Sequence, residues 1–263
     1  MQNLVGAVTP LVAACVVAYL AGWLAFVVSR PVAGKTLLVT GWLLNGALFV
    51  VNGLIAREPP MGNMYHVLVL LALCMPPLYA TLALRGRLAW TGAYFAFSSA
   101  LPLIGALFMK HDVHWQRLPA LQSPWFVPHV FAYMLSYALA AVAFSLLVGR
   151  WGRTWLRLPV EGPAYASAAH EIMRLAFPFM TFGLLSGALW AEEAWGVYWS
   201  WDPKETWSLL TWVLYLTYLH CRRSPHTERY ADPAHALAFT ALVITFLVVN
   251  LLPKLASALH SYA

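Results

Sequence analysis

Histidine is the residue type in this chain with the clearest capacity for chemistry, because a neutral imidazole can ligate a metal and can exchange a proton near neutral pH. Nine histidines are present. Three of them stand at the ends of apolar segments or close to the C-terminus: His129 follows Trp125, His220 ends the run WVLYLTYLH, and His260 lies in LASALHSY. Five of the others keep the simpler interpretation of solvated or hydrogen-bonded residues: His111, His114, His170, His226 and His235. The remaining one, His66, stays open as an additional ligand.

Six of the thirteen tryptophans lie between Trp190 and Trp212, around the string WAEEAWGVYWSWDPKETW. One or two tryptophans at a helix end anchor a protein at a membrane surface, because the ring is apolar and its N–H is polar. Six exceed what anchoring needs. The same segment carries Glu192, Glu193, Asp202, Lys204 and Glu205. It therefore predicts an aromatic surface with a polar edge, suited to a flat, mostly apolar ligand that bears a few charges.

An aromatic surface near two histidines is typical of a haem site with two imidazole ligands. His129 and His260 are the candidates on the side of the tryptophans, and the alternative is an aromatic belt with two histidines that reach the membrane surface. His220 falls at the opposite end of its segment. It is either a second ligand site, whose partner ligand another subunit supplies, or a helix-end histidine beside Arg222.

The composition excludes a soluble enzyme and indicates an all-α, polytopic integral membrane protein, with 61% hydrophobic and 10% charged residues. A membrane-spanning helix needs roughly 20 apolar residues. Eight segments qualify: about 4–28, 36–55, 65–84, 88–108, 126–149, 175–190, 206–221 and 235–252. The sixth and seventh are short, at about 16 residues each, which favours a connecting loop that lies along the membrane surface.

The positive charges orient these spans, since cytoplasmic loops carry the excess of Lys and Arg. With the N-terminus outside, eleven of the sixteen basic residues are cytoplasmic and five are external. The chain is then one membrane domain, 1–263, with an external tryptophan-rich loop at 191–205 and both termini outside. The net charge of +6 needs no nucleic acid to explain it, and contact with anionic lipid accounts for part of it.

The three cysteines stand singly, at Cys15, Cys74 and Cys221, without a C-x-x-C or C-x-x-C-H motif. The chain therefore lacks a recognisable dithiol redox site and a site for attaching haem covalently to itself. No residue stands out as a general acid or base. We expect no catalytic residue, and any catalysis would come from positioning a substrate.

The string WGVYWSWDPKETW resembles the tryptophan-rich WWD signature of the haem-handling superfamily that includes CcsA, ResC, CcmC and CcmF. LPALQSPWFVPHVFAYMLSYA, VNLLPKLASALHSYA and PPMGNMYHVLVL resemble other segments of that superfamily, so the likeness extends from about residue 59 to the C-terminus. The Asp-Pro-Lys-Glu-Thr-Trp version resembles the CcsA/ResC branch of cytochrome c biogenesis proteins (system II). Departures are His66, where the family usually has Glu, and Pro253 and Ala258 in the closing motif.

The resemblance implies haem b, held non-covalently, as the cofactor. It implies that His129 and His260 ligate haem at the external face and that His220 ligates it within the membrane. The residues implied to contact haem at the tryptophan-rich loop are Trp195, Trp199, Trp201, Asp202 and Trp207. It further implies that haem is delivered across or at the membrane and presented to apocytochrome c for covalent attachment.

The implied partners are a CcsB/ResB-like membrane subunit, apocytochrome c and membrane lipid, in the bacterial inner membrane with the tryptophan-rich loop on the periplasmic side. A holocytochrome c synthase activity would be shared with that subunit. Two alternatives stand beside this function. One is a haem exporter or chaperone without synthase activity. The other is a haem-bearing electron-transfer subunit, which usually pairs its ligands on facing helices at one depth.

Overall fold

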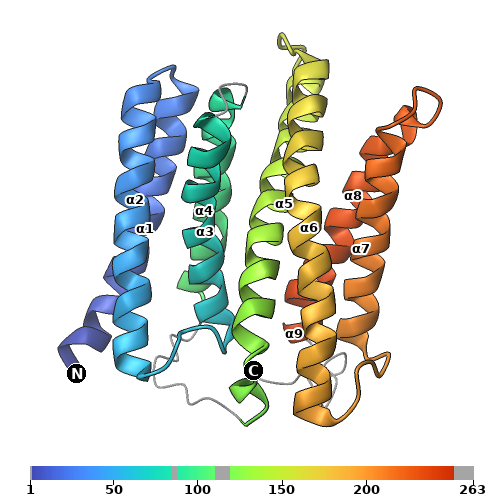
Figure 1. Cartoon of the computed structure of the whole chain (residues 1–263). Helices are drawn as coiled ribbons and strands as arrows, with labels where there is room; N and C mark the ends of the chain where they lie inside the picture. The colour runs from blue at the N-terminus through green and yellow to red at the C-terminus, as the bar shows by residue number, and fades with distance from the viewer. Residues whose placement is uncertain (1, 85–87, 110–118, 252–263) are drawn as a thin grey trace. The chain divides into compact units, whose positions relative to one another are not determined.

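The computed structural model describes residues 2–84, 88–109 and 119–251, and every regular element in these residues is a helix. The helices form two compact units, residues 1–117 and 118–263. Figure 1 shows each unit as a set of long antiparallel helices. The expected all-α, polytopic membrane fold is confirmed.

The first unit contains four long helices. They are α1 (Gln2–Val27), α2 (Pro31–Ala56), α3 (Met64–Leu84) and α4 (Gly92–Leu107), with the short 3-10 turn η1 (Ala89–Thr91) before α4. α1 packs on α2 and α4, and α3 packs on α4. Close approach depends on glycine: a Cβ on Gly34 or on Gly92 would lie 2.8 or 2.7 Å from the Phe26 ring. Small residues commonly allow such approach in membrane helices, where burial of apolar surface does not drive association.

Two buried asparagines on α2 add polar contacts within the first unit. Asn45 donates from Nδ2 to the Val69 carbonyl at 3.4 Å, and Asn52 donates to the Tyr65 hydroxyl at 3.1 Å. Both asparagines are fully buried. Side-chain hydrogen bonds between helices stabilise a packing register in an apolar surrounding, so these contacts fix how α2 meets α3.

The second unit contains the segments that carry the candidate site. Its elements are η2 (Pro119–Gln122), α5 (Phe126–Trp155), α6 (Gly162–Trp195), α7 (Pro203–Cys221), η3 (Glu228–Tyr230), α8 (Ala231–Val243), the π-turn η4 (Ile244–Val248) and α9 (Val249–Leu251). α5 packs along α6, α7 packs along α8, and further contacts join α6 to α7 and α5 to α8.

Seven of the described helical segments are long and apolar enough to span a membrane. Each of them corresponds to one of the expected spans. The expected seventh span, α7, is not among them, because its first turn contains the polar residues Lys204, Glu205 and Thr206 and the rest of the helix is rich in Tyr and Thr. α7 nevertheless runs beside α6 and α8 within the unit (Figure 1).

The expectation of a short sixth span was wrong. α6 has 34 residues, because a polar first part that includes His170 and Arg174 is helical as well. That part buries Ala168, Ala169 and Ile172, so its apolar face is one stripe that average hydropathy conceals. α6 also continues to Trp195, and the non-helical part of the loop expected at 191–205 is only 196–202.

Candidate functional site

His129 lies in the first turn of α5, and its imidazole is oriented by the backbone of α6. Its Nδ1 lies 2.8 Å from the carbonyl oxygen of Gly183. Because a carbonyl only accepts, Nδ1 carries the proton, and the neutral ring has its lone pair on Nε2. A second hydrogen bond of this kind is how proteins usually fix the tautomer and direction of a ligating histidine.

The His129 ring is held between aromatic rings and a glycine. The Tyr133 ring is edge-on at 5.0 Å and the Trp190 ring is tilted at 5.4 Å, measured between centroids. On α6, a Cβ at Gly187 would lie 2.7 Å from Cε1 of His129, and one at Gly183 would lie 3.0 Å from the Tyr133 ring. The two glycines, four residues apart, form a notch that admits both rings of α5.

Trp190 joins His129 to the tryptophan-rich segment. Its indole Nε1 donates to the carbonyl of Ala120 at 2.7 Å, and its ring contacts Phe126 at 5.5 Å and Trp195 at 5.1 Å. A hydrogen bond from Ser123 to Glu193 makes a second link between the chain before α5 and the end of α6. An aromatic series therefore leads from His129 to the start of the loop.

Trp199 and Trp201 form a separate pair, with ring centroids 5.8 Å apart and planes at 86°. Trp201 is 68% exposed, and its backbone has a left-handed φ of 59°. Such a conformation is strained for a large side chain and is found where the surroundings enforce it, often at functional sites. Trp199 buries its Nε1 without a hydrogen-bond partner among the described residues.

Asp202 is the N-cap of α7. Its carboxylate accepts from the Glu205 N–H at 2.8 Å, while Glu205 accepts from the backbone N–H groups of Ser200 and Asp202 at 2.8 and 3.3 Å. This reciprocal capping box, with Pro203 at the first helical position, fixes where the loop ends and the helix begins. The Asp-Pro-Lys-Glu part of the motif is thus explained by the capping of α7, whether or not it contacts a ligand.

Lys204 connects the loop to the end of the last helix. Its Nζ donates to Oδ1 of Asn250 at 3.1 Å. Burial lowers the pKa of Lys204 to about 8, and the carboxylate of Asp202 raises it in part. Trp207 lies half-buried in the first turns of α7, where its carbonyl accepts from the Thr211 hydroxyl at 2.8 Å.

His220 lies at the other end of α7, about 27 Å from Asp202 by the rise of an α-helix. The side chain is exposed, and its Nδ1 lies 2.8 Å from the Leu216 carbonyl, so Nε2 carries the lone pair here too. His220 and the tryptophan-rich segment thus lie at opposite ends of α7, as the sequence predicts.

The structure thus brings His129 together with Trp190, and through Trp190 with Trp195. His220 lies away from this group, at the far end of α7. His260 and the closing motif lie outside the described residues. Within the described residues, no group of three or more His, Cys, Asp or Glu side chains could hold a metal ion. Trp190, Gly183 and Gly187 were not singled out as site residues, although the G-x-x-x-G spacing from Gly183 to Gly187 was a readable sign of close helix packing.

The apolar helices define an integral membrane protein, and a family match assigns it to cytochrome c maturation. The chain belongs to the family "Cytochrome C assembly protein", which matches residues 4–256. The membership in this family that the tryptophan-rich motif and the histidine-bearing segments predict is therefore confirmed.

Relatives within the family are cytochrome c biogenesis proteins CcsA. The protein of Chlamydomonas reinhardtii is 38% identical over 220 residues, which cover 77% of this chain and 60% of that protein. The protein of Trieres chinensis is 30% identical over 270 residues, with 85% of each chain covered. These similarities confirm the expected CcsA branch.

The solved structure of "Cytochrome c Heme Lyase CcmF" superposes on this chain with a TM-score of 0.69. The match covers 90% of this chain and 45% of that protein, at 18% sequence identity. It shows that the fold is shared.

Proposed function

We propose that this chain holds haem at the end of the second unit that carries the tryptophans and presents it to apocytochrome c for covalent attachment. The observation that supports this function best is the placement of His129. Gly183 fixes the tautomer of His129, and Trp190 and Tyr133 pack against its ring. Such an imidazole is prepared to bind iron through Nε2 without reorganisation.

Non-covalent haem b fits the donors and surfaces near His129. The imidazole of His129 would supply one iron ligand and His260 would supply the other. Trp195, Trp199 and Trp201 offer apolar rings for the porphyrin plane. Trp201 is exposed and therefore available to a flat ligand. Asp202 and Lys204 follow Trp201 in the sequence and would supply polar groups beside these rings.

The chemistry asked of the chain is positioning and ligand exchange. In apocytochrome c, two cysteine thiols add across the two vinyl groups, so that each sulfur bonds one vinyl carbon and the thiol hydrogen goes to the other. The apocytochrome histidine would then take the place of one imidazole of this chain. His129 would hold the haem in position for the thiols, which is an entropic contribution rather than acid–base catalysis.

His220 is the proposed ligand for haem at an earlier stage of transfer. It is exposed on α7, so a second imidazole would come from a CcsB/ResB-like partner subunit that covers this face. We place the tryptophan-rich loop on the periplasmic side of a bacterial inner membrane, because the basic residues concentrate at the opposite ends of the helices.

The test is haem content of the detergent-purified protein, co-produced with its partner subunit. We expect a six-coordinate, low-spin haem spectrum in the wild type. His220→Ala should load several-fold less haem, and added imidazole should restore part of it. His129→Ala should load haem but hold it poorly. His226→Ala, which removes an exposed histidine in the turn after α7, is the matched control and should behave as the wild type.

Covalent attachment to a co-produced apocytochrome distinguishes a synthase from a carrier. Formation of thioether-linked haem that depends on His129 supports the proposed function. Haem binding that depends on His129 without any thioether formation would indicate a haem exporter or chaperone instead. Full haem content in both His129→Ala and His220→Ala would contradict the proposal.

A further inference from the structure

A cavity of about 360 Å³ lies at the end of the second unit that is far from the tryptophan-rich loop. α5 and α7 end there, and α6 and α8 begin there. The residues that line the cavity are Arg150, Gly162, Pro163, Ala166, Ser167, Arg222, Glu228, Arg229 and Asp232. Its volume is in the range of small-molecule sites.

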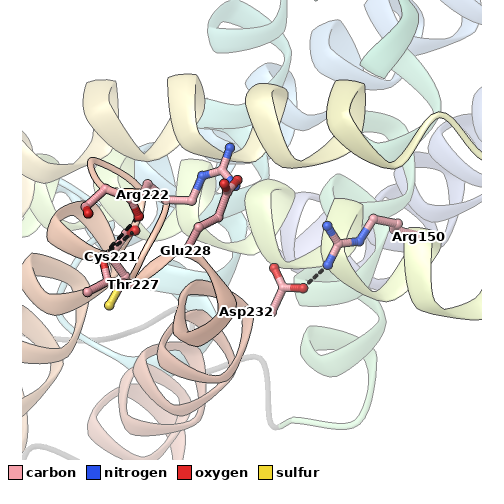
Figure 2. Close-up of polar contacts among 7 residues, drawn as sticks. Arg150, Cys221, Arg222, Thr227, Glu228 and Asp232 are labelled. Atoms are coloured by element: carbon pink, nitrogen blue, oxygen red, sulfur yellow. Dashed lines mark hydrogen bonds and ion pairs between the residues drawn. The ribbon is translucent and has the colours of Figure 1, made fainter.

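The charges around this cavity favour an anion. Arg150 pairs with Asp232, and Arg222 donates from Nη1 to Glu228 at 2.6 Å. Figure 2 shows the side chains of both pairs. Arg229 is a third cation, stacked over the Tyr230 ring at 4.7 Å. Three guanidinium groups against two carboxylates leave a net charge of +1.

The start of α6 adds to this positive potential. The first turns of α6, from Gly162 to Ser167, form one wall of the cavity. The N-terminus of a long helix carries partial positive charge. Pro163 has no N–H. The N–H groups of Ala164 and Tyr165 bond the carbonyl of Glu161, so the helix end contributes this partial charge rather than a set of free donors. The helix end and the arginines therefore act in the same direction.

Two buried polar groups at this site have no hydrogen-bond partner in the part of the chain that the structure describes. The Arg222 side chain is only 14% exposed. Its Nε is buried and has no hydrogen-bond partner among the described residues. A second, smaller space of about 10 Å³ shares lining residues with this cavity: Arg150, Ala166, Arg222 and Asp232. Tyr218 and His235 also line it. His235 is 1% exposed, and its Nε2 also has no partner among the described residues. Buried polar groups are normally satisfied, so these atoms indicate a ligand and a bridging water.

This cavity is separate from the proposed haem ligand on the same helix. Arg222 lines the cavity and Tyr218 lines the smaller space beside it, whereas His220, between them in sequence, is exposed. Two residues along an α-helix turn the side chain by about 200°. His220 therefore faces away from the arginines.

We propose that this cavity binds the phosphate of an anionic phospholipid headgroup, held by Arg150, Arg222 and the start of α6. Headgroup phosphates are concentrated where membrane-spanning helices end. Basic pockets between such helices are suited to these headgroups. A guanidinium binds phosphate through several donors at once, which the free Nε of Arg222 permits.

The experiment measures lipid retention by native mass spectrometry of the detergent-purified full chain. Phosphatidylglycerol is the anionic probe. Phosphatidylcholine has the same phosphodiester with no net charge, and inorganic phosphate represents a free anion. We expect one retained phosphatidylglycerol in the wild type, with phosphatidylcholine bound more weakly. Arg222→Gln should weaken phosphatidylglycerol binding by about tenfold or more, since a charge-assisted hydrogen bond is lost.

Two further variants keep the result interpretable. Ser167→Glu adds a negative charge at an exposed position of the cavity wall and leaves both ion pairs intact, so it should weaken binding without unfolding the protein. Arg223→Gln removes the same charge from the neighbouring residue, which does not line the cavity, and should change binding by less than about twofold.

Three results would overturn the proposal. Equal lipid retention in the wild type and all variants would show adsorption to the surface alone. Stabilisation by inorganic phosphate that follows the variants, with no retained lipid, would identify a free anion as the ligand. Haem content that falls in Arg222→Gln and Ser167→Glu while lipid retention stays constant would show that the cavity binds the haem carboxylates.

Discussion

At the scale of single residues, the His129 ring can lie against α6 only because residue 187 of α6 is a glycine, which has no side chain. A Cβ at Gly187 would come within 2.8 Å of two atoms of the imidazole. Contacts this short force a neighbour to move. The His129 ring lies in the first turn of a helix packed on α6, so any movement would disturb the bond from Nδ1 to Gly183.

Gly187→Ala should therefore displace the His129 ring and weaken haem retention, with a cost in folding stability of about 1–3 kcal/mol from overpacking. Gly152→Ala is the matched control, because a Cβ at Gly152 of α5 meets nothing within 4 Å. The control should be neutral or slightly stabilised. Haem content and thermal unfolding in detergent measure both effects. Equal haem content in the two variants would show that the notch does not position the ligand.

Asp202 allows the structural and ligand-binding roles of the tryptophan-rich motif to be separated. Asp202→Ala removes the N-cap of α7 and should cost about 1 kcal/mol. Asp202→Ser keeps a capping oxygen and should retain most of that stability. Haem content then decides the role of the carboxylate. If Asp202→Ser holds haem as the wild type does, Asp202 acts through the cap, and a selective loss of haem in this variant would indicate a direct contact.

The residue types of the candidate site were readable from the sequence, but their contacts were not. His129 drew attention because an imidazole can ligate iron, and the tryptophans did so because six in one segment exceed what membrane anchoring needs. Trp190 and the two glycines of α6 contribute through contacts with residues about 55 to 70 positions away, which no local pattern reveals. Asp202 was interpreted as a ligand-contact residue, although the Asp-Pro-x-Glu order is also a capping pattern.

At the scale of helices, apolar content predicted where α1 to α5 lie but not how far α6 extends. The prediction failed for 162–174 because polar residues on one face of a helix lower its average hydropathy while the other face remains buried. The end of α6 was missed for the same reason: Glu192 and Glu193 look like loop residues but lie in the last turn of the helix.

Lys204 links the start of α7 to the end of α8 and α9, and this link should depend on pH. Its pKa in the folded chain is about 8, below the usual value of 10.5. Below pH 8 the amine is charged in both the folded and the unfolded chain, so the full cost of burying this charge lowers the free energy of unfolding. Between pH 8 and 10.5 the unfolded chain binds more protons, so folding stability should rise with pH.

Comparison of the wild type with Lys204→Met isolates this effect. At pH 7 the variant should unfold at the same or a higher temperature, and the wild type should gain on it as the pH rises from 8 to 10. Thermal unfolding at a series of pH values measures the difference. A wild type that loses stability relative to the variant over this range would show that the Lys204 amine is stabilised in its charged form.

At the scale of the whole molecule, the orientation in the membrane remains the property with the most consequences. A cysteine introduced at the exposed Ser200, in a chain with Cys221→Ser, should react with a membrane-impermeant maleimide added to intact cells. Native Cys221, at the other end of α7, should react only after permeabilisation. The reverse pattern would place the tryptophan-rich loop inside and remove the basis for presenting haem to a periplasmic apocytochrome.

The π-turn at Ile244–Val248 bears on how the length of α8 can change during evolution. There the Val249 N–H bonds the carbonyl five residues earlier, so the turn contains one residue more than an α-turn. Loss of one residue inside it would restore an ordinary α-turn and leave Asn250 facing Lys204. Loss of one residue elsewhere in α8 would rotate all that follows by about 100°. We therefore expect homologues to gain or lose single residues here, with the connection to the C-terminal tail unchanged.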